Sequence, residues 1–157
     1  MLTVKEMGKI NVIKVSTKKD LDAFIKFPLD LYAGNEQFVP EMANDVRDSF
    51  NPEKNHGLSF TEVQAFIAER DGEVVGRIAG IINTRANKKW NASVVRFGYI
   101  DFIDDLEVSK ALLDTVVEWG RERGMTEIQG PLGITDFDKE GMLVEDFDRL
   151  GSMIDIY

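Results

Sequence analysis

The chain contains no cysteine and only one histidine among its 157 residues. The lack of cysteine excludes disulfides, thiolate metal sites and a cysteine nucleophile. The single histidine, His56, lies in the polar segment NPEKNHG and is interpreted as an ordinary loop residue. We therefore expect neither a metal site nor a serine–histidine–aspartate triad.

Long apolar runs are also missing. No segment approaches the roughly 20 apolar residues that a membrane-spanning helix needs. The first fifteen residues, MLTVKEMGKINVIKV, lack the uninterrupted apolar stretch of a signal peptide. We therefore expect a cytoplasmic protein, and the length is sufficient for one domain with a real hydrophobic core.

Basic residues are outnumbered by acidic ones. The chain has 28 Asp and Glu against 19 Lys and Arg, which gives a net charge of −9. Nucleic acids and anionic lipid surfaces attract basic proteins, so neither is expected as a partner. The acidity is interpreted as a feature that favours solubility.

The first third of the sequence predicts a strand followed by two helices. Residues 10–15 alternate between apolar and polar side chains, as in a half-buried strand. Thr17 and Asp20 resemble a capping box that opens a helix, and Pro28 should kink or end that helix. A second, short helix is expected within residues 41–50.

The middle of the sequence predicts an antiparallel meander. Asp71-Gly72 between two apolar runs is a strong hairpin signal. Gly76 and Gly80, inside the second run, indicate a bulge or a close approach of another backbone. Residues 84–91 are interpreted as a polar, basic connection. The meander is expected within residues 63–103, with strands at 64–70, 73–83 and 94–103.

Residues 94–130 organise the rest of the chain. An apolar strand runs into an acidic turn at Asp104 and Asp105, which opens a long amphipathic helix that ends near Gly124. A short strand follows at residues 125–129. A strand, a crossover helix and a second strand predict a parallel pair with a right-handed connection. The edge where the first strand ends and the helix begins is where α/β sheets usually place ligands.

This order of elements resembles the GNAT acyltransferase fold from about residue 10 to residue 130. The most specific piece is the Asp-Gly hairpin followed by KALL at residues 110–113 and WGRERG at residues 119–124. These segments are similar to the central strand and coenzyme-binding helix of GNAT enzymes. Further segments resemble a group of longer bacterial GNAT-like proteins. They lie at residues 97–105, 130–131 and 140–145.

The resemblance implies an α/β fold with a mixed sheet. An antiparallel meander would be followed by a parallel β-α-β unit in one domain over residues 1–157. The family's last strands and last helix are not visible, and residues 134–149 are interpreted as a loop with one or two helical turns. We therefore expect a domain that is incomplete at its C-terminus.

The resemblance also implies acyl transfer from acetyl-CoA or another acyl-CoA to the amine of a small molecule or peptide. The coenzyme would lie along Phe102 and Ile103, with its pyrophosphate at the helix start near Asp104 and Ser109. Tyr99 and Asp101 are the candidates for the catalytic base, ahead of two glutamates elsewhere in the meander. They share one face of the central strand if its side chains alternate.

The pyrophosphate motif departs from the family pattern. GNAT enzymes usually have Arg or Gln, two residues, Gly, one residue, then Gly or Ala, and the matching residues here are Asp104, Glu107 and Ser109. Carboxylates at this corner would repel a pyrophosphate, although they are also ordinary helix starters.

Two functional hypotheses therefore stay open. One is an N-acyltransferase, or the N-terminal part of one. The other is a non-catalytic GNAT-like domain with a degraded coenzyme site that acts in binding or oligomerisation. For these two residues the structural alternative is that Tyr99 packs and Asp101 caps or pairs. An exposed sheet edge at residues 125–129 predicts a homodimer.

Overall fold

The computed structural model describes residues 8–135 and 137–149 and contains a five-stranded sheet in the order β1-β2-β3-β4-β5. Neighbouring strands are antiparallel up to β4, and β4 pairs with β5 in parallel, as the sequence predicts. The strands are β1 (Asn11–Lys14), β2 (Thr61–Arg70), β3 (Glu73–Asn83), β4 (Val94–Phe102) and β5 (Glu127–Gln129).

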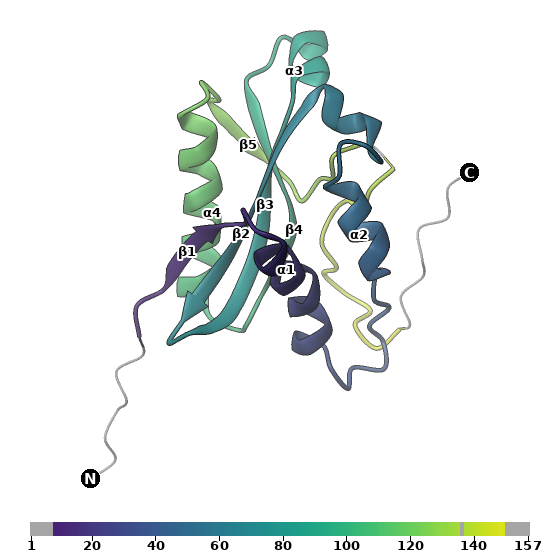
Figure 1. The fold of residues 1–157 in the computed structure, drawn as a ribbon, viewed down its shortest axis with the longest axis vertical. Coiled ribbons are helices and arrows are strands. Elements are labelled where there is room, and N and C mark those ends of the chain that lie inside the picture. The colour runs from purple at the N-terminus through teal and green to yellow at the C-terminus, as the bar shows by residue number, and fades with distance from the viewer. Residues whose placement is uncertain (1–7, 136, 150–157) are drawn as a thin grey trace.

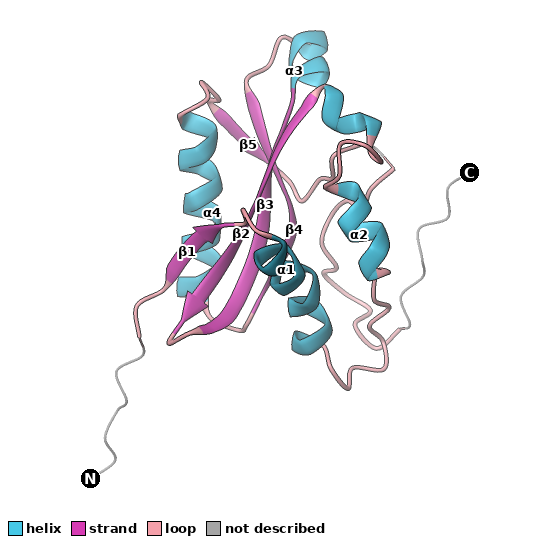
Figure 2. Cartoon of the chain, viewed as in Figure 1, coloured by secondary structure: helices cyan, strands magenta, loops and turns pink. Residues whose placement is uncertain are grey.

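Helices cover both faces of this sheet. Helix α4 lies on one face, and α1 and α2 lie on the other (Figure 1; Figure 2 colours the same view by secondary structure). The helices are α1 (Lys18–Leu31), α2 (Ala43–Ser49), a 3-10 turn (His56–Ser59), α3 (Thr84–Trp90) and α4 (Leu106–Arg121).

Helix α4 packs closely against β3. Its buried side chains recur every three or four residues and include Leu112 and Trp119, which confirms the predicted apolar stripe. A Cβ added at Gly76 would lie 2.8 Å from Leu112 Cδ1, and one added at Gly80 would lie 2.8 Å from Trp119 Cε3. The two glycines therefore give room to side chains of the helix and not to another backbone. The predicted bulge lies next to Gly76, since Ala68 pairs with Gly76 and Glu69 pairs with Val74.

The N-terminus of α1 is the predicted capping box. Asp20 N donates to Thr17 Oγ1 at 3.1 Å, and Thr17 N donates to Asp20 Oδ2 at 2.9 Å. The helix does not end at Pro28, however, and continues to Leu31. Because proline has no N–H, the carbonyl four residues earlier, that of Phe24, lacks its helical donor.

Arg77 supplies the missing donor. Its Nη1 donates to Phe24 O at 3.1 Å, and its Nε donates to Asp101 Oδ2 at 2.8 Å. The other oxygen of Asp101 accepts a hydrogen bond from the Tyr32 hydroxyl at 2.9 Å. Arg77 is only 4% exposed, so one buried guanidinium links α1, β3 and β4.

Two segments differ from the sequence prediction. Residues 84–91 were expected to be an irregular connection, but most of them form helix α3, which Asn83 caps by accepting from Ala86 N at 2.9 Å. Residues 134–149 form a loop as predicted, but the described residues in this range contain no helical turn. In this acidic stretch the apolar residues do not recur every three or four positions, so a helix here would have no apolar face to pack.

The link through Arg77 can be tested with a double-mutant cycle. Arg77→Met removes the cation that pairs with Asp101, leaves that carboxylate only the Tyr32 hydroxyl, and leaves the Phe24 carbonyl without its donor. It should lower the unfolding free energy measured in urea by about 3–5 kcal/mol. Ala at position 28 has an N–H that can donate to Phe24 O. Arg77→Met should therefore cost about 1 kcal/mol less in a Pro28→Ala background. If the free-energy costs of Arg77→Met and Pro28→Ala were strictly additive, Arg77 would not be the donor that replaces the missing N–H of Pro28.

Candidate functional site

The parallel strands β4 and β5 pair only over a short distance. Their register covers Val94 to Arg96, and beyond it Leu132 N donates to Phe97 O at 2.9 Å. Among the described residues, this is the last backbone hydrogen bond on that side of β4. The rest of the strand, up to Phe102, therefore presents backbone groups along an open edge that leads to the start of α4.

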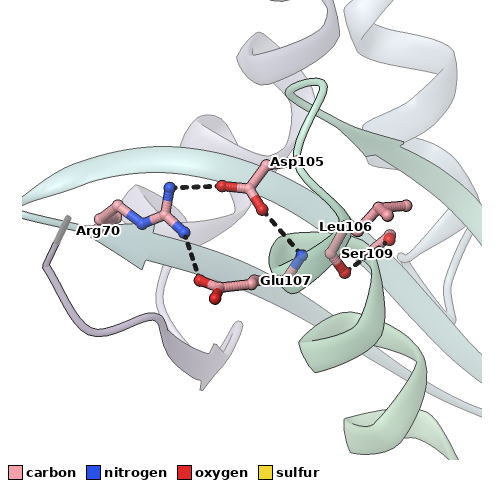
Figure 3. A network of polar contacts seen from close by, with 5 residues as sticks. All are labelled: Arg70, Asp105, Leu106, Glu107 and Ser109. Atoms are coloured by element: carbon pink, nitrogen blue, oxygen red, sulfur yellow. Dashed lines mark hydrogen bonds and ion pairs between the residues drawn. The ribbon is translucent and has the colours of Figure 1, made fainter.

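The corner between β4 and α4 is held by an ion-pair network (Figure 3). Asp105 is the N-cap of α4, and its Oδ1 accepts from Glu107 N at 2.8 Å. Its Oδ2 accepts from Arg70 Nη1 at 2.7 Å, while Arg70 Nη2 lies 3.5 Å from Glu107 Oε2. The hydrogen bond from Arg70, followed by that from Glu107 N, holds the pKa of Asp105 below its usual value.

This network changes the interpretation of the acidic corner. The sequence suggested three uncompensated carboxylates, but Asp105 and Glu107 both face Arg70, whose side chain is only 9% exposed. Asp104 and Glu107 are exposed, and Asp105 is half-buried. Sequence reasoning missed Arg70, because nothing in the local pattern links the end of β2 to a turn 35 residues later.

The other predicted coenzyme-binding residues lie at the same corner. Phe102 and Ile103 pack against the core under α4, and Ile103 N donates to Val75 O at 3.0 Å. Ser109 lies in the first turn of α4, where its hydroxyl donates to Leu106 O at 3.1 Å. The structure thus brings all four predicted positions together, although their role in binding coenzyme stays a prediction.

A cavity of about 460 Å³ lies on the opposite face of the sheet. Its walls come from α1, α2, the end of β4 and the loop that follows β5. Its charged lining residues are the acids Glu41, Asp45, Asp101 and Asp138 and the cations Arg77 and Lys139. Since Arg77 is paired with Asp101, the other charged residues of the lining are three acids and one lysine, and their net charge is negative. Its apolar lining residues include Ile25, Leu29, Phe38, Val46, Ile100 and Met142.

A β-bulge turns Tyr99 toward this cavity. Ala79 pairs with Gly98 and Arg77 pairs with Asp101, so β4 has one more residue than β3 between these pairs. Tyr99 takes the extra place with a φ of 51°. Tyr99 and Asp101 therefore share one face, as expected, and both line the cavity.

The surroundings of these two residues favour different chemical roles. Burial, and then the negative charge of Asp138, raise the pKa of Tyr99 to about 12, so its hydroxyl keeps its proton at neutral pH. Asp101 already accepts hydrogen bonds from Arg77 and Tyr32. Of the residues that line the cavity, sequence reasoning missed Arg77 and Asp138. A single arginine inside the apolar run of β3 was the available signal for the first.

No family model matches the chain. Protein YghO from Escherichia coli (strain K12) is 34% identical over 131 residues, which cover 83% of this chain and 33% of that protein. A bacterial ceramide synthase from Caulobacter vibrioides (strain NA1000 / CB15N) is 31% identical over 140 residues, covering 88% of this chain and 36% of that protein. The chain therefore spans about a third of the length of these curated relatives.

Solved structures share the arrangement of strands and helices. The aminoglycoside N-acetyltransferase AAC(6')-Iy in complex with CoA has a TM-score of 0.57 at 16% identity, covering 92% of this chain and 97% of that one. An acyl-CoA N-acyltransferase from Pseudomonas aeruginosa has a TM-score of 0.53 at 14% identity, covering 74% of each chain. The chain has the GNAT fold.

In the GNAT fold of this chain, the edge of β4 is open beyond Phe97. At the corner where α4 begins, Asp105 is the helix cap and Arg70 is the cation beside it. No group of side chains suited to a metal ion is found among residues 8–135 and 137–149. In those same ranges no helix is long and apolar enough to cross a membrane.

The tyrosines of the cavity region predict a loss of stability at high pH. Burial and Asp101 raise the pKa of Tyr32 to about 12, against an ordinary value of 10.0, and the pKa of Tyr99 is raised equally. The folded state thus holds both phenolic protons more tightly than the unfolded state. This stabilisation is complete below pH 10 and is lost as the pH rises through 12.

Urea unfolding at pH 9 and pH 11.5 measures this effect. The Tyr99→Phe variant should lose less unfolding free energy between the two pH values than the unmodified chain, by of order 1 kcal/mol. Equal losses would show that the hydroxyl of Tyr99 is not the buried, proton-holding group described above.

Proposed function

We propose that this chain forms the acyl-CoA-binding part of an N-acyltransferase. The observation that carries the proposal is the opening of β4 from β5 beside the start of α4, with an acid-lined cavity on the other face of the same strand. Acyl-CoA would supply an activated acyl group as a thioester. The open backbone edge of β4, up to Phe102, would hold its pantetheine arm.

The proposed acceptor is an amine that carries an apolar chain. Glu41, Asp45 and Asp138 would attract the ammonium group to the cavity, while the apolar residues of α1 and α2 would bury the chain. The name of the relative from Caulobacter supports this choice, because a ceramide is an amide of a long-chain amine. The match covers 88% of this chain and 36% of that relative.

The side chains around Tyr99 would share the chemical work. The amine nitrogen bonds to the acyl carbon, the carbon–sulfur bond breaks, one proton leaves the nitrogen and one joins the sulfur. We propose Tyr99 as the group that donates this last proton, because its pKa of about 12 keeps it protonated. Asp101 would position Tyr32 and Arg77, and Asp138 would accept the proton of the amine.

Binding and transfer can be measured separately. Calorimetry with CoA and with palmitoyl-CoA should show saturable binding, and Ser109→Trp, which adds bulk at the first turn of α4, should weaken it at least tenfold. Lys110→Ala, one residue further along α4 on an exposed position, is the matched control and should bind normally. No binding at millimolar coenzyme would favour the non-catalytic alternative.

Transfer is tested by the release of free CoA with three acceptors. Dodecylamine offers both an amine and a chain, dodecanol only the chain, and ethanolamine an amine without a long chain. Dodecylamine should be clearly the best acceptor, and Asp45→Asn should raise its KM with little change in kcat. Equal rates with all three would contradict the proposed acceptor, and binding without transfer would leave the chain a coenzyme-binding domain.

A further inference from the structure

Helix α3 differs from the rest of this acidic chain. Within seven residues it carries Arg85, Lys88 and Lys89, it contains no acidic residue, and none of its residues is buried. It ends at Trp90, which is 72% exposed and is the most exposed aromatic residue among those described. Three cations beside an exposed indole thus form one patch, the α3 patch, on a chain with a net charge of −9.

The α3 patch is fixed to the sheet by polar side chains that point inward. Asn83 caps the helix, and Asn87 Nδ2 donates to Val94 O at 2.9 Å while its Oδ1 accepts from Val94 N at 3.3 Å. The helix projects at the end of β3 (Figure 2). Its outward residues are therefore presented on a rigid support.

Two of the three cations of the α3 patch lie against aromatic rings. The Arg85 guanidinium is 4.1 Å from the centre of the Phe60 ring, and Lys89 Nζ is 5.0 Å from that of Trp90. An acid on the neighbouring strand, Glu62, is paired with Arg123 at 2.7 Å. In the part of the chain that the structure describes, no ion pair joins Arg85, Lys88 or Lys89 to an acid.

We propose that the α3 patch binds the headgroups of an anionic lipid surface. Tryptophan prefers the boundary between headgroups and acyl chains, and lysine and arginine beside it interact with anionic headgroups. A nucleic acid is less suited, because the chain as a whole has a net charge of −9 and would repel a long polyanion that extends past the patch. The expectation drawn from net charge concerns the whole surface, whereas this contact needs only one end of the molecule.

Vesicle binding tests this proposal with the intact chain. The chain should sediment with vesicles of phosphatidylglycerol and phosphatidylcholine at low salt, and not with vesicles of phosphatidylcholine alone. Lys88→Glu with Lys89→Glu should reduce the bound fraction at least about tenfold, since each cation contributes severalfold. Lys18→Glu with Lys19→Glu is the matched control: it makes the same charge change on two adjacent exposed lysines of α1 and should bind normally.

Tryptophan fluorescence identifies the residue that enters the interface. The chain has two tryptophans, and the other one, Trp119, lies on the buried face of α4 and is only 3% exposed. Emission should shift to shorter wavelength on anionic vesicles, and Trp90→Phe should abolish the shift while the protein still sediments. The proposal would be overturned if the two double-lysine variants lost vesicle binding equally. It would also be overturned if the chain did not bind anionic vesicles, or bound duplex DNA in their place.

Discussion

The structure depends on the buried guanidinium of Arg77. A buried charge is costly unless it is paired and hydrogen-bonded, and Arg77 meets both conditions through Asp101 and the carbonyl of Phe24. The same contacts hold α1 against β4 and thereby shape one wall of the cavity. Pro28 makes this link necessary, because it frees the carbonyl that Arg77 then satisfies.

A second arginine plays a comparable part on the other face. Arg70 pairs with Asp105 and Glu107 where α4 begins, so this corner holds charged side chains where the family pattern has glycines. Any phosphate that binds there must approach Arg70 as well as the helix N–H groups. The two arginines mark the two ends of the proposed reaction site, one at the coenzyme corner and one beside the acceptor cavity.

The sequence correctly predicted those turns and helices whose signals lie within a few neighbouring residues. The Asp-Gly hairpin, the box formed by Thr17 and Asp20, and the apolar stripe of α4 all follow from patterns within a few residues. The same reasoning missed what depends on distant residues: the bond from Arg77 to the Phe24 carbonyl, the pairing of Arg70 with Asp105, and the acids that meet at the cavity. Only the fold brings those groups together. Helix α3 was missed for another reason, since its exposed face has no apolar periodicity.

Coenzyme is proposed to bind where β4 leaves β5 and α4 begins. The most direct measurement is a titration of the isotopically labelled chain with CoA, followed through the backbone amide signals in nuclear magnetic resonance. The account predicts that the largest shifts cluster in residues 97–109, on the open edge of β4 and the first turn of α4. Shifts centred elsewhere, or no shifts at millimolar CoA, would contradict it.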